Sequence, residues 1–545
     1  MPDTSVLATP HQRINSFFGI RYVLPPTGER RWQQPTPIDG KPWPAQKPII
    51  NATAPGPHCI AINNFPWIPG SAAPDGLESY ESEDCLYLNV LVPRNPASAK
   101  LPVLVNIHGG GYVGGVPENG DAFVHQAQGE VIFVAIQYRL GVFGFLAGDE
   151  IRESGAANAG LLDQREALDW IQRHIGSFGG DPDKVTIMGG SAGGGSVSIQ
   201  MMLHGGQQPP PFRAAIPEYA WWTPMYNQTW VDNQYRRVLE SSSCADVSCL
   251  RNLPAAALNN AAWRAWKAAL DAAETVYGLF YYGPTIDGEA VLGSPAEQFR
   301  AGNFSKVPVL VDRDMFEGPT FTPVTLSTGD ELVADLRAVW QTVPDALIRE
   351  VVELYPSSTY NSSLVRSTPW FNALTGGYNV STAFVQRQAI FGVSVVDCPS
   401  TAIVQASVDA GQKAYKMVFE AGSQLHGATA PYLWSKNIGC KLCSFPFTIL
   451  GNSLTCFDSV DGASTLGATS FPGNATLAHA LRHYVAAFAI NLDPNQSKSS
   501  VELPLWPEFT NEDRQILHMQ EDSIGVAHDF DFDEQCDMLN SLSTL

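Results

Sequence analysis

One short run, Val185–Gly194, most limits what this chain can fold into. Four residues with strand preference, Val185–Met188, lead directly into Gly-x-Ser-x-Gly, with Ser191 at its centre. This pattern is typical of a sharp turn between a buried strand and a helix, where a strained serine presents its hydroxyl outward. Gly189 and Gly193 leave room where strand and helix crowd together, and the following helix N-terminus favours negative charge nearby. The same pattern also arises by chance in a chain with 47 glycines, so the rest of the sequence must supply an acid, a base and an oxyanion hole.

Composition excludes several classes of protein. The chain has 545 residues, 44% hydrophobic and 16% charged, which is enough apolar material for a large core and argues against global disorder. The net charge of −21 argues against nucleic acid and anionic membrane surfaces as partners. No run of roughly 18 apolar residues occurs, so we expect no membrane insertion.

The chain alternates strands with helices. The predicted strands are Phe18–Tyr22, Cys85–Val92, Pro102–Ile107, Val131–Ile136, Val185–Met188, Val307–Val311 and Lys413–Phe419, and the clearest predicted helices are Leu161–Ile175 and Ala478–Ile490. Several strands are almost continuously apolar, as in strands buried on both faces. We therefore predict an α/β fold with a mainly parallel sheet. Helix-rich insertions are expected at about 230–300 and 330–410, and no linker divides the chain, which predicts a single domain over 1–545.

A second glycine-rich turn follows the strand that ends at Ile107. His108-Gly109-Gly110-Gly111-Tyr112 leaves this strand with three consecutive glycines, which let backbone N–H groups face a neighbouring site without side-chain obstruction. Together with the serine turn, this favours an oxyanion hole over an ordinary glycine turn.

The acid and the base are less sharply defined by the residues alone. The segment after Val311 offers Asp312, Asp314 and Glu317, and spacing does not choose among them. His426 follows the strand that ends at Phe419 and is the favoured base, because the order serine, acid, histidine with each after a strand is typical of this kind of site.

Cysteines and sequons bear on the compartment. Nine cysteines and seven Asn-x-Ser/Thr sequons, which start at Asn51, Asn227, Asn303, Asn361, Asn379, Asn474 and Asn495, favour a secreted, N-glycosylated protein. Met1-Pro2-Asp3-Thr4 is not a secretion signal, so we expect a signal peptide that this sequence lacks. The alternative is an intracellular protein.

These motifs together resemble the carboxylesterase type B family of α/β-hydrolases, which includes cholinesterases and fungal lipases, and most closely its secreted fungal esterases. The segments that carry the resemblance run through nearly the whole chain in the family's order: Pro25–Gly28, Glu83–Asn89, His108–Tyr112, Asn158–Arg165, Phe178–Pro182, Gly189–Gly193, Ile286–Gly288, Glu317–Gly318, His426–Gly427, Asp493–Asn495 and Trp506–Pro507. The resemblance implies an α/β-hydrolase fold with a large, mostly parallel sheet and helical insertions that cap an active-site gorge.

The resemblance also implies roles for individual residues. It assigns Ser191 as nucleophile, Glu317 as acid and His426 as base, and it makes the backbone N–H groups of Gly110, Gly111 and Ala192 the oxyanion hole. It implies disulfides Cys59–Cys85 and Cys244–Cys249 and a buried ion pair between Arg31 and Glu83. Cys398, Cys440, Cys443, Cys456 and Cys536 are left without an implied partner, and at least one of them must be unpaired or paired outside the chain.

Several positions depart from the family pattern. Asp312 replaces a usual glycine, Phe316 a usual polar residue, and Thr429 a frequent acidic residue. In the family, the segment that is Glu218–Trp222 here lines the acyl side of the pocket. We therefore expect Trp221, Trp222 and, beside the glycine turn, Tyr112 to line the substrate pocket, with the alternative that one of the two tryptophans packs in the core.

The expected function is a serine carboxylesterase that forms an acyl-enzyme on Ser191 and needs no metal or organic cofactor. Its expected partner is a small or medium soluble ester, because the loop between Cys59 and Cys85 is short and interrupted by prolines, unlike the longer lid of fungal lipases. A lipase that acts on longer acyl esters is the first alternative. A non-catalytic binding protein is the second, since the family includes adhesion proteins that keep the fold.

Overall fold

In the computed structural model of the chain, the described residues are 5–7, 9–10, 13–38, 49–225, 227–363, 368, 371–375, 379–435, 474–496, 502–531 and 534–542. Cys440, Cys443 and Cys456 lie outside them.

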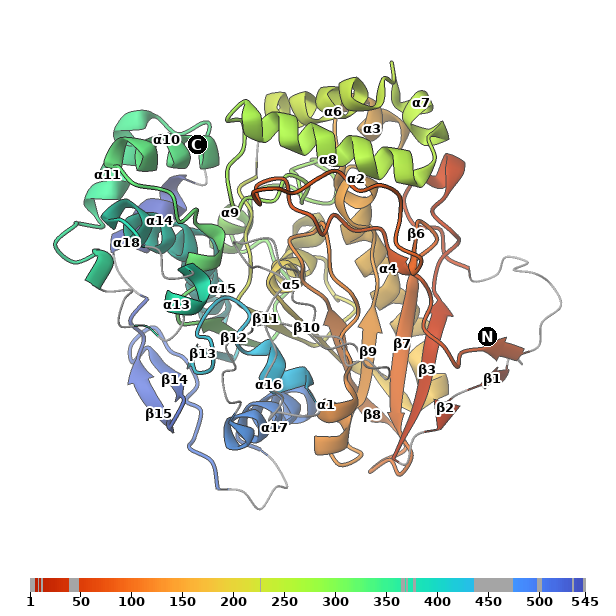
Figure 1. The fold of residues 1–545 in the computed structure, drawn as a ribbon. Helices are drawn as coiled ribbons and strands as arrows, with labels where there is room; N and C mark the ends of the chain where they lie inside the picture. Colours follow the sequence, from red (N-terminus) through yellow and green to blue (C-terminus); the bar gives the residue numbers. More distant parts are fainter. Residues whose placement is uncertain are drawn as a thin grey trace.

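An 11-stranded sheet forms the centre of the molecule (Figure 1). Its strands, in spatial order, are β15 (Ser523–His528), β14 (Gln515–Gln520), β13 (Ala414–Glu420), β12 (Val309–Asp314), β11 (Ala214–Glu218), β10 (Gly180–Gly190), β8 (Leu101–Ile107), β9 (Ile132–Ile136), β7 (Tyr87–Pro93), β3 (Ile14–Arg21) and β2 (Thr9–Pro10). Neighbours from β14 to β9 pair in parallel, and the outer pairs are antiparallel. This is the mixed, mostly parallel sheet that the sequence predicts. Two small pairs lie outside it, β1 (Ser5–Leu7) with β4 (Ile49–Asn51) and β5 (His58–Cys59) with β6 (Glu81–Ser82).

Helices cover both faces of the sheet and bury two separate cores. Alternate residues of one strand serve different cores, as in β8, where Val103 and Val105 belong to one core and Leu104 to the other. The first core packs the sheet against α2 (Gly141–Phe145), α3 (Asp149–Ser154), α4 (Ala159–His174) and α5 (Ala192–Met202). The second core packs it against α1 (Asp121–Gln126), α16 (Ala430–Trp434) and α17 (Ala475–Asn491). The near-continuous apolar strands are therefore buried on both sides, as predicted.

The two helix-rich insertions are present. The first contains α6 (Gln228–Ser242), α7 (Val247–Asn252), α8 (Ala255–Asp271) and α9 (Pro295–Arg300). The second contains α10 (Gly329–Val339), α11 (Asp345–Glu353), α13 (Phe371–Thr375), α14 (Thr382–Gly392), a π-helical turn (Val393–Asp397) and α15 (Cys398–Asp409). In Figure 1, α6–α8 lie together above one half of the sheet, and α10, α11 and α14 lie beyond the other half with α18 (Glu534–Leu542).

The helical stretch Thr382–Asp409 is long and apolar enough to cross a membrane by length and composition. However, 61% of its apolar window is buried inside the fold, as in the core helix of a folded protein. Among the described residues no other helix meets that criterion.

Three disulfides join described cysteines. Cys59–Cys85 and Cys244–Cys249 are the two pairs that the resemblance implied. Cys398–Cys536 was not predicted, because its partners lie 138 residues apart and only the fold brings them together. The implied ion pair is also formed, since Arg31 Nε lies 2.6 Å from Glu83 Oε1 and Arg31 Nη2 lies 2.8 Å from Glu83 Oε2.

The end of β12 differs from the prediction. The sequence analysis ended this strand at Val311, but β12 continues to Asp314. Charged residues are tolerated there because each finds a polar partner: Asp312 accepts a hydrogen bond from the backbone N–H of Tyr219 at 3.1 Å, and Asp314 accepts three from the loop after His426. Asp312 and Asp314 are therefore strand residues, whereas Glu317 lies in the turn beyond the strand end.

Candidate active site

The serine turn has the conformation that the sequence pattern predicts. Ser191 stands between the end of β10 and the start of α5 with φ 60° and ψ −127°, a backbone state that L-residues rarely adopt. Its N–H donates to Glu218 O at 3.2 Å, and its own carbonyl accepts from Gly195 N at 2.8 Å and from Trp221 N at 3.1 Å. These bonds hold the strained residue in place. A β-carbon at Gly193 would lie 2.2 Å from Ile107 O, so the close approach of α5 to β8 requires glycine there.

Three side chains that follow strands of the central sheet meet at this turn. His426 follows β13, Glu317 follows β12, and Ser191 follows β10. His426 Nε2 lies 2.8 Å from Ser191 Oγ, and His426 Nδ1 lies 2.5 Å from Glu317 Oε2. All three residues are buried, with exposed fractions of 7% for Ser191, 4% for His426 and 2% for Glu317. The arrangement can move a proton from a hydroxyl to an imidazole that a carboxylate orients.

The glycine turn after β8 abuts the serine turn. A β-carbon at Gly109 would lie 3.1 Å from Ser191 Cβ. Gly110 and Gly111 have φ of 110° and 63°, a region that glycine enters without steric cost. Within the described residues, the N–H groups of Gly110, Gly111 and Ala192 donate to no protein acceptor. They stay the predicted oxyanion donors, since an N–H group without a protein acceptor is available to a negatively charged oxygen.

The side chain of His108 contacts the backbone of the glycine turn. Its ring stacks on Tyr138 with centroids 4.5 Å apart, and its Nδ1 lies 2.9 Å from Gly109 O. Burial lowers the pKa of His108 to about 4, so the ring is neutral near pH 7 and Nδ1–H is the donor in this bond. The sequence analysis treated His108 only as part of the motif and did not assign it this contact.

Aromatic side chains surround the imidazole of His426. The rings of Tyr219, Trp221 and Phe321 all meet it edge to face, with centroids 5.1, 5.5 and 5.1 Å away. Phe280 and Phe391 extend this wall behind Trp221. Tyr219 lies in the Glu218–Trp222 segment that was expected to line the pocket, whereas Phe280, Phe321 and Phe391 were not predicted. Their only signal is the local density of aromatic residues, which does not show which of them reach the site.

The three residues expected to line the pocket occupy different places. Trp221 is fully buried and faces His426. Trp222 points to another side, where it stacks on Phe299 and donates from Nε1 to Ser198 Oγ at 2.8 Å, and both tryptophans belong to the same buried core. Tyr112 is 1% exposed, and its ring meets Phe145 edge to face.

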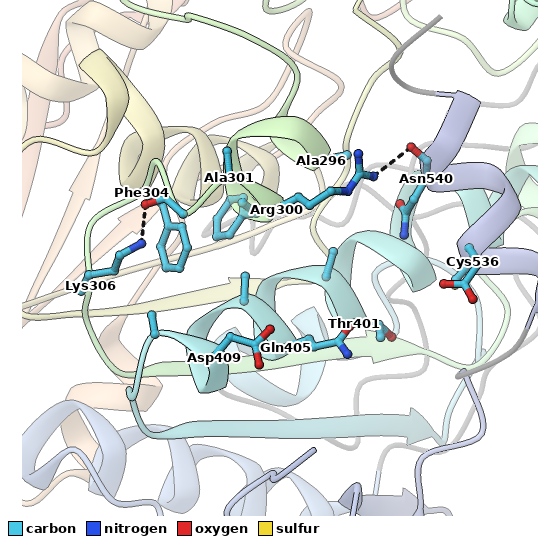
Figure 2. Close-up of a pocket in the computed structure, with 16 residues that line it drawn as sticks. Ala296, Arg300, Ala301, Phe304, Lys306, Thr401, Gln405, Asp409, Cys536 and Asn540 are labelled. Atoms are coloured by element: carbon cyan, nitrogen blue, oxygen red, sulfur yellow. Dashed lines mark hydrogen bonds between the residues drawn. The ribbon is translucent and has the colours of Figure 1, made fainter. Parts of the chain in front are cut away.

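A separate cavity of about 750 Å³ opens between α9, α15 and α18 (Figure 2). None of the three meeting side chains lines it. Its two cationic side chains are already engaged, since Lys306 Nζ donates to Gly302 O at 2.6 Å and Arg300 Nη2 donates to Asn540 O at 3.1 Å. The described residues contain no cluster of three or more His, Cys, Asp or Glu placed to hold a metal ion.

Comparisons with known proteins identify the family and the fold of the chain. A model of the carboxylesterase family matches residues 5–539. Lipase 1 of Geotrichum candidum is 30% identical over 93% of this chain and 88% of its own length. Carboxylesterase patB of Aspergillus clavatus is 36% identical over 57% of this chain and 62% of its own length. The crystal structure of Aspergillus niger EstA superposes with a TM-score of 0.79 and covers 100% of this chain and 97% of EstA, at 24% identity, which shows the shared fold. The fold is therefore that of the α/β-hydrolases, and the chain belongs to the carboxylesterase family of carboxylic ester hydrolases.

Proposed function

We propose that Ser191, His426 and Glu317 carry out ester hydrolysis in two acyl-transfer steps. The observation that carries the proposal is the continuous contact from Ser191 Oγ through both ring nitrogens of His426 to Glu317 Oε2. His426 Nε2 takes the hydroxyl proton while Ser191 Oγ attacks the carbonyl carbon of the ester. The bond to the alcohol then breaks, and the alcohol leaves with the proton from His426. Water attacks the acyl-enzyme with His426 again as base and releases the carboxylic acid.

The oxyanion of each tetrahedral intermediate would be held by Gly110, Gly111 and Ala192. In support, the glycine turn lies against the serine turn, since a β-carbon at Gly109 would lie 3.1 Å from Ser191 Cβ, and no backbone bond among the described residues uses these three N–H groups. Such preorganised donors contribute about 2.7–4 kcal/mol each to lowering the barrier in comparable sites. Glu317 would keep His426 in the tautomer with the proton on Nδ1 and stabilise the imidazolium.

The favoured substrates are small or medium soluble esters. Within the loop closed by Cys59–Cys85, Phe65 and Trp67 are 5% and 6% exposed, stack on each other at 5.0 Å and pack on Phe280. These side chains are already buried against the aromatic wall and form no exposed apolar lid. Together with the shortness of the loop and its prolines, this packing supports soluble esters over an emulsified substrate. Trp221 would limit the size of the acyl group beside His426.

Secretion and N-glycosylation belong to the same proposal. Relatives include proteins named as secreted lipases from Botryotinia fuckeliana and Gibberella zeae, and three disulfides persist best in an oxidising compartment. Asn51, Asn227 and Asn303 are exposed sequon residues and the favoured sites. Asn474 and Asn495 are poorer sites, because their side-chain nitrogens donate to Glu521 O at 2.8 Å and to Trp506 O at 2.9 Å.

The test is a chain-length series of acyl esters assayed with the native protein and with Ser191→Ala. The native protein should prefer short or medium acyl chains in solution, and Ser191→Ala should lose several orders of magnitude in kcat because the nucleophile is gone. Glu331→Gln, on the exposed N-terminal turn of α10, serves as a matched control and should behave as the native protein.

Two outcomes would contradict the proposal in different ways. Full activity of Ser191→Ala would remove the nucleophile assignment. A jump in rate when the substrate forms an emulsion would favour the lipase alternative and leave the nucleophile assignment intact.

A further inference from the structure

Asp314 makes an unusual set of contacts beside the site. It is the last residue of β12, and its side chain is completely buried. Asp314 Oδ2 accepts hydrogen bonds from Gly427 N at 2.6 Å and Ala428 N at 3.0 Å, and Oδ1 accepts one from Thr429 N at 3.2 Å. Three consecutive backbone N–H groups that converge on one carboxylate form an anion-binding nest. The residues that supply them directly follow His426.

The same residue also contacts the acid. Asp314 N–H donates to Glu317 Oε1 at 2.7 Å, while Glu317 Oε2 pairs with His426 Nδ1 at 2.5 Å. A closed ring of contacts results: Asp314 holds Glu317 through its backbone and the loop of His426 through its side chain. Moving Asp314 would therefore move the base relative to the acid.

The loop that carries His426 is held by few long-range hydrogen bonds among the described residues, of which one joins Gly422 N to Glu521 Oε2 at 2.9 Å. It runs from the end of β13 at Glu420 to the start of α16 at Ala430. Its own backbone bonds are short-range turns, such as Ala428 N to Leu425 O at 2.8 Å. A further long-range backbone bond of the described residues joins this loop to the β12 turn, from Phe316 N to Gln424 O at 2.9 Å, on the N-terminal side of His426. Asp314 is thus the anchor on the C-terminal side.

We propose that Asp314 is a positioning residue for His426, an inference that rests on the proposed catalytic roles of Ser191, His426 and Glu317. Its carboxylate fixes the backbone directly after the base, and through it the line from Nε2 to Ser191 Oγ. The titratable groups that face Asp314 are Asp312 and Glu317 on the β12 segment, and Glu218 and Tyr219 at the end of β11. Burial, Glu317 and Asp312 raise the pKa of Asp314, and the N–H groups of Gly427 and Ala428 oppose that rise because they favour the ionised form.

The competing explanation is that Asp314 only stabilises the fold by capping the short helix α16. The two explanations differ in what they predict for catalysis by molecules that are folded. A capping residue affects how many molecules are folded, and it leaves kcat per folded molecule unchanged. A positioning residue affects kcat per folded molecule and leaves substrate binding nearly intact.

The experiment compares Asp314→Ala, Asp314→Asn and the control Asp312→Asn, using a soluble short-chain ester and folded protein quantified by circular dichroism. Asp314→Ala should lower kcat about 100-fold with KM within about threefold, because small misplacements of a catalytic group cost roughly that much. Asp314→Asn should lose only about 10-fold, since its carbonyl oxygen can still accept from Gly427 and Ala428. The rate of Ser191 labelling by an organophosphonate should fall in the same order, because labelling also needs the base. Asp312→Asn should keep native kcat, because its carbonyl oxygen can still accept from Tyr219 N.

Native kcat in folded Asp314→Asn and Asp314→Ala would overturn the inference, as would a loss that appears only in KM. If Asp314→Ala does not fold, the inference is tested by kcat of Asp314→Asn, which should be about 10-fold lower than kcat of Asp312→Asn. The proposed function fails separately, through an active Ser191→Ala. If Ser191→Ala is inactive and Asp314→Asn keeps native kcat, this inference is wrong and the proposed function stands.

Discussion

Strand β12 separates two buried groups of charged side chains that are built in opposite ways. On one side lies the paired cluster, Arg313, Lys416, Asp397, Asp529 and Asp531. On the other lies the carboxyl cluster, Glu218, Asp312, Asp314 and Glu317. The alternation of side chains along a strand explains the separation, because Arg313 must point away from Asp312 and Asp314.

In the paired cluster each cation has a close anion. Lys416 Nζ is fully buried and lies 2.7 Å from Asp529 Oδ2 and 3.0 Å from Asp531 Oδ2, and Arg313 Nε lies 2.5 Å from Asp531 Oδ2. Burial alone would raise the pKa of Asp531, but Arg313 and Lys416 outweigh it and lower that pKa below its ordinary value. Burial raises the pKa of Asp397 to about 8, although Arg313 and Lys416 oppose that rise.

The carboxyl cluster lacks such compensation. Among the described residues, no Lys or Arg pairs with Glu218, Asp312 or Asp314. Burial first, and then the neighbouring carboxyls, raise the pKa of Glu218, and burial raises the pKa of Asp312 to about 8. Asp312 therefore holds a proton near pH 7, which costs stability. We infer from this difference that the paired cluster on one face of β12 stabilises the fold. The carboxyl cluster on the other face, beside the proposed catalytic residues, lowers the stability of the fold.

The largest expected effect comes from breaking the paired cluster. Lys416→Met should lower the free energy of unfolding by about 3–5 kcal/mol, because it leaves Asp529 and Asp531 buried with too little positive charge. Urea unfolding measures this loss. The matched control is Lys267→Met, which removes an exposed helix-surface pair with Asp271 and should change stability by less than about 0.5 kcal/mol. Equal effects of the two changes would contradict the comparison.

A smaller effect, of opposite sign in the two clusters, comes from neutralising one acid in each. The pKa of Asp312 is about 8 in the folded state and near 3.8 when unfolded, so between these values the folded state binds a proton that the unfolded state releases. The stability of the native protein therefore falls as pH rises from about 4 to about 8. Asp312→Asn removes this loss and should be more stable than the native protein by about 1–2 kcal/mol at pH 8, with no gain near pH 4.

Asp529→Asn is the counterpart in the paired cluster and should destabilise the protein at pH 8, because Lys416 loses its closest anion. Thermal unfolding at pH 4 and pH 8 measures both variants. If both substitutions shift stability in the same direction at pH 8, the two faces of β12 are not different in the way described here.

Much of the fold followed from the sequence because it rests on local patterns. The apolar strands, the Gly-x-Ser-x-Gly turn and the triple glycine at 109–111 all express backbone requirements that one stretch of chain reveals. The choice among Asp312, Asp314 and Glu317 did not follow from spacing. It depends on where β12 ends, and charged residues that find buried partners lengthened that strand beyond Val311.

Contacts between distant segments were the least predictable. Cys398–Cys536, the nest around Asp314 and the aromatic wall on His426 all join residues whose neighbourhood only the complete sheet creates. The one available signal for the nest was two acids spaced by two, with Arg313 between them, at the end of an apolar run. That spacing places Asp312 and Asp314 on one face but does not show what they meet there.

The most direct test of the central claim is covalent labelling by a fluorophosphonate, followed by peptide mass spectrometry of the native protein and of Ser191→Ala. The account predicts one adduct per chain, on Ser191, with loss of esterase activity in proportion to labelling and no adduct in Ser191→Ala. An adduct on another residue, or undiminished hydrolysis by fully labelled protein, would contradict it.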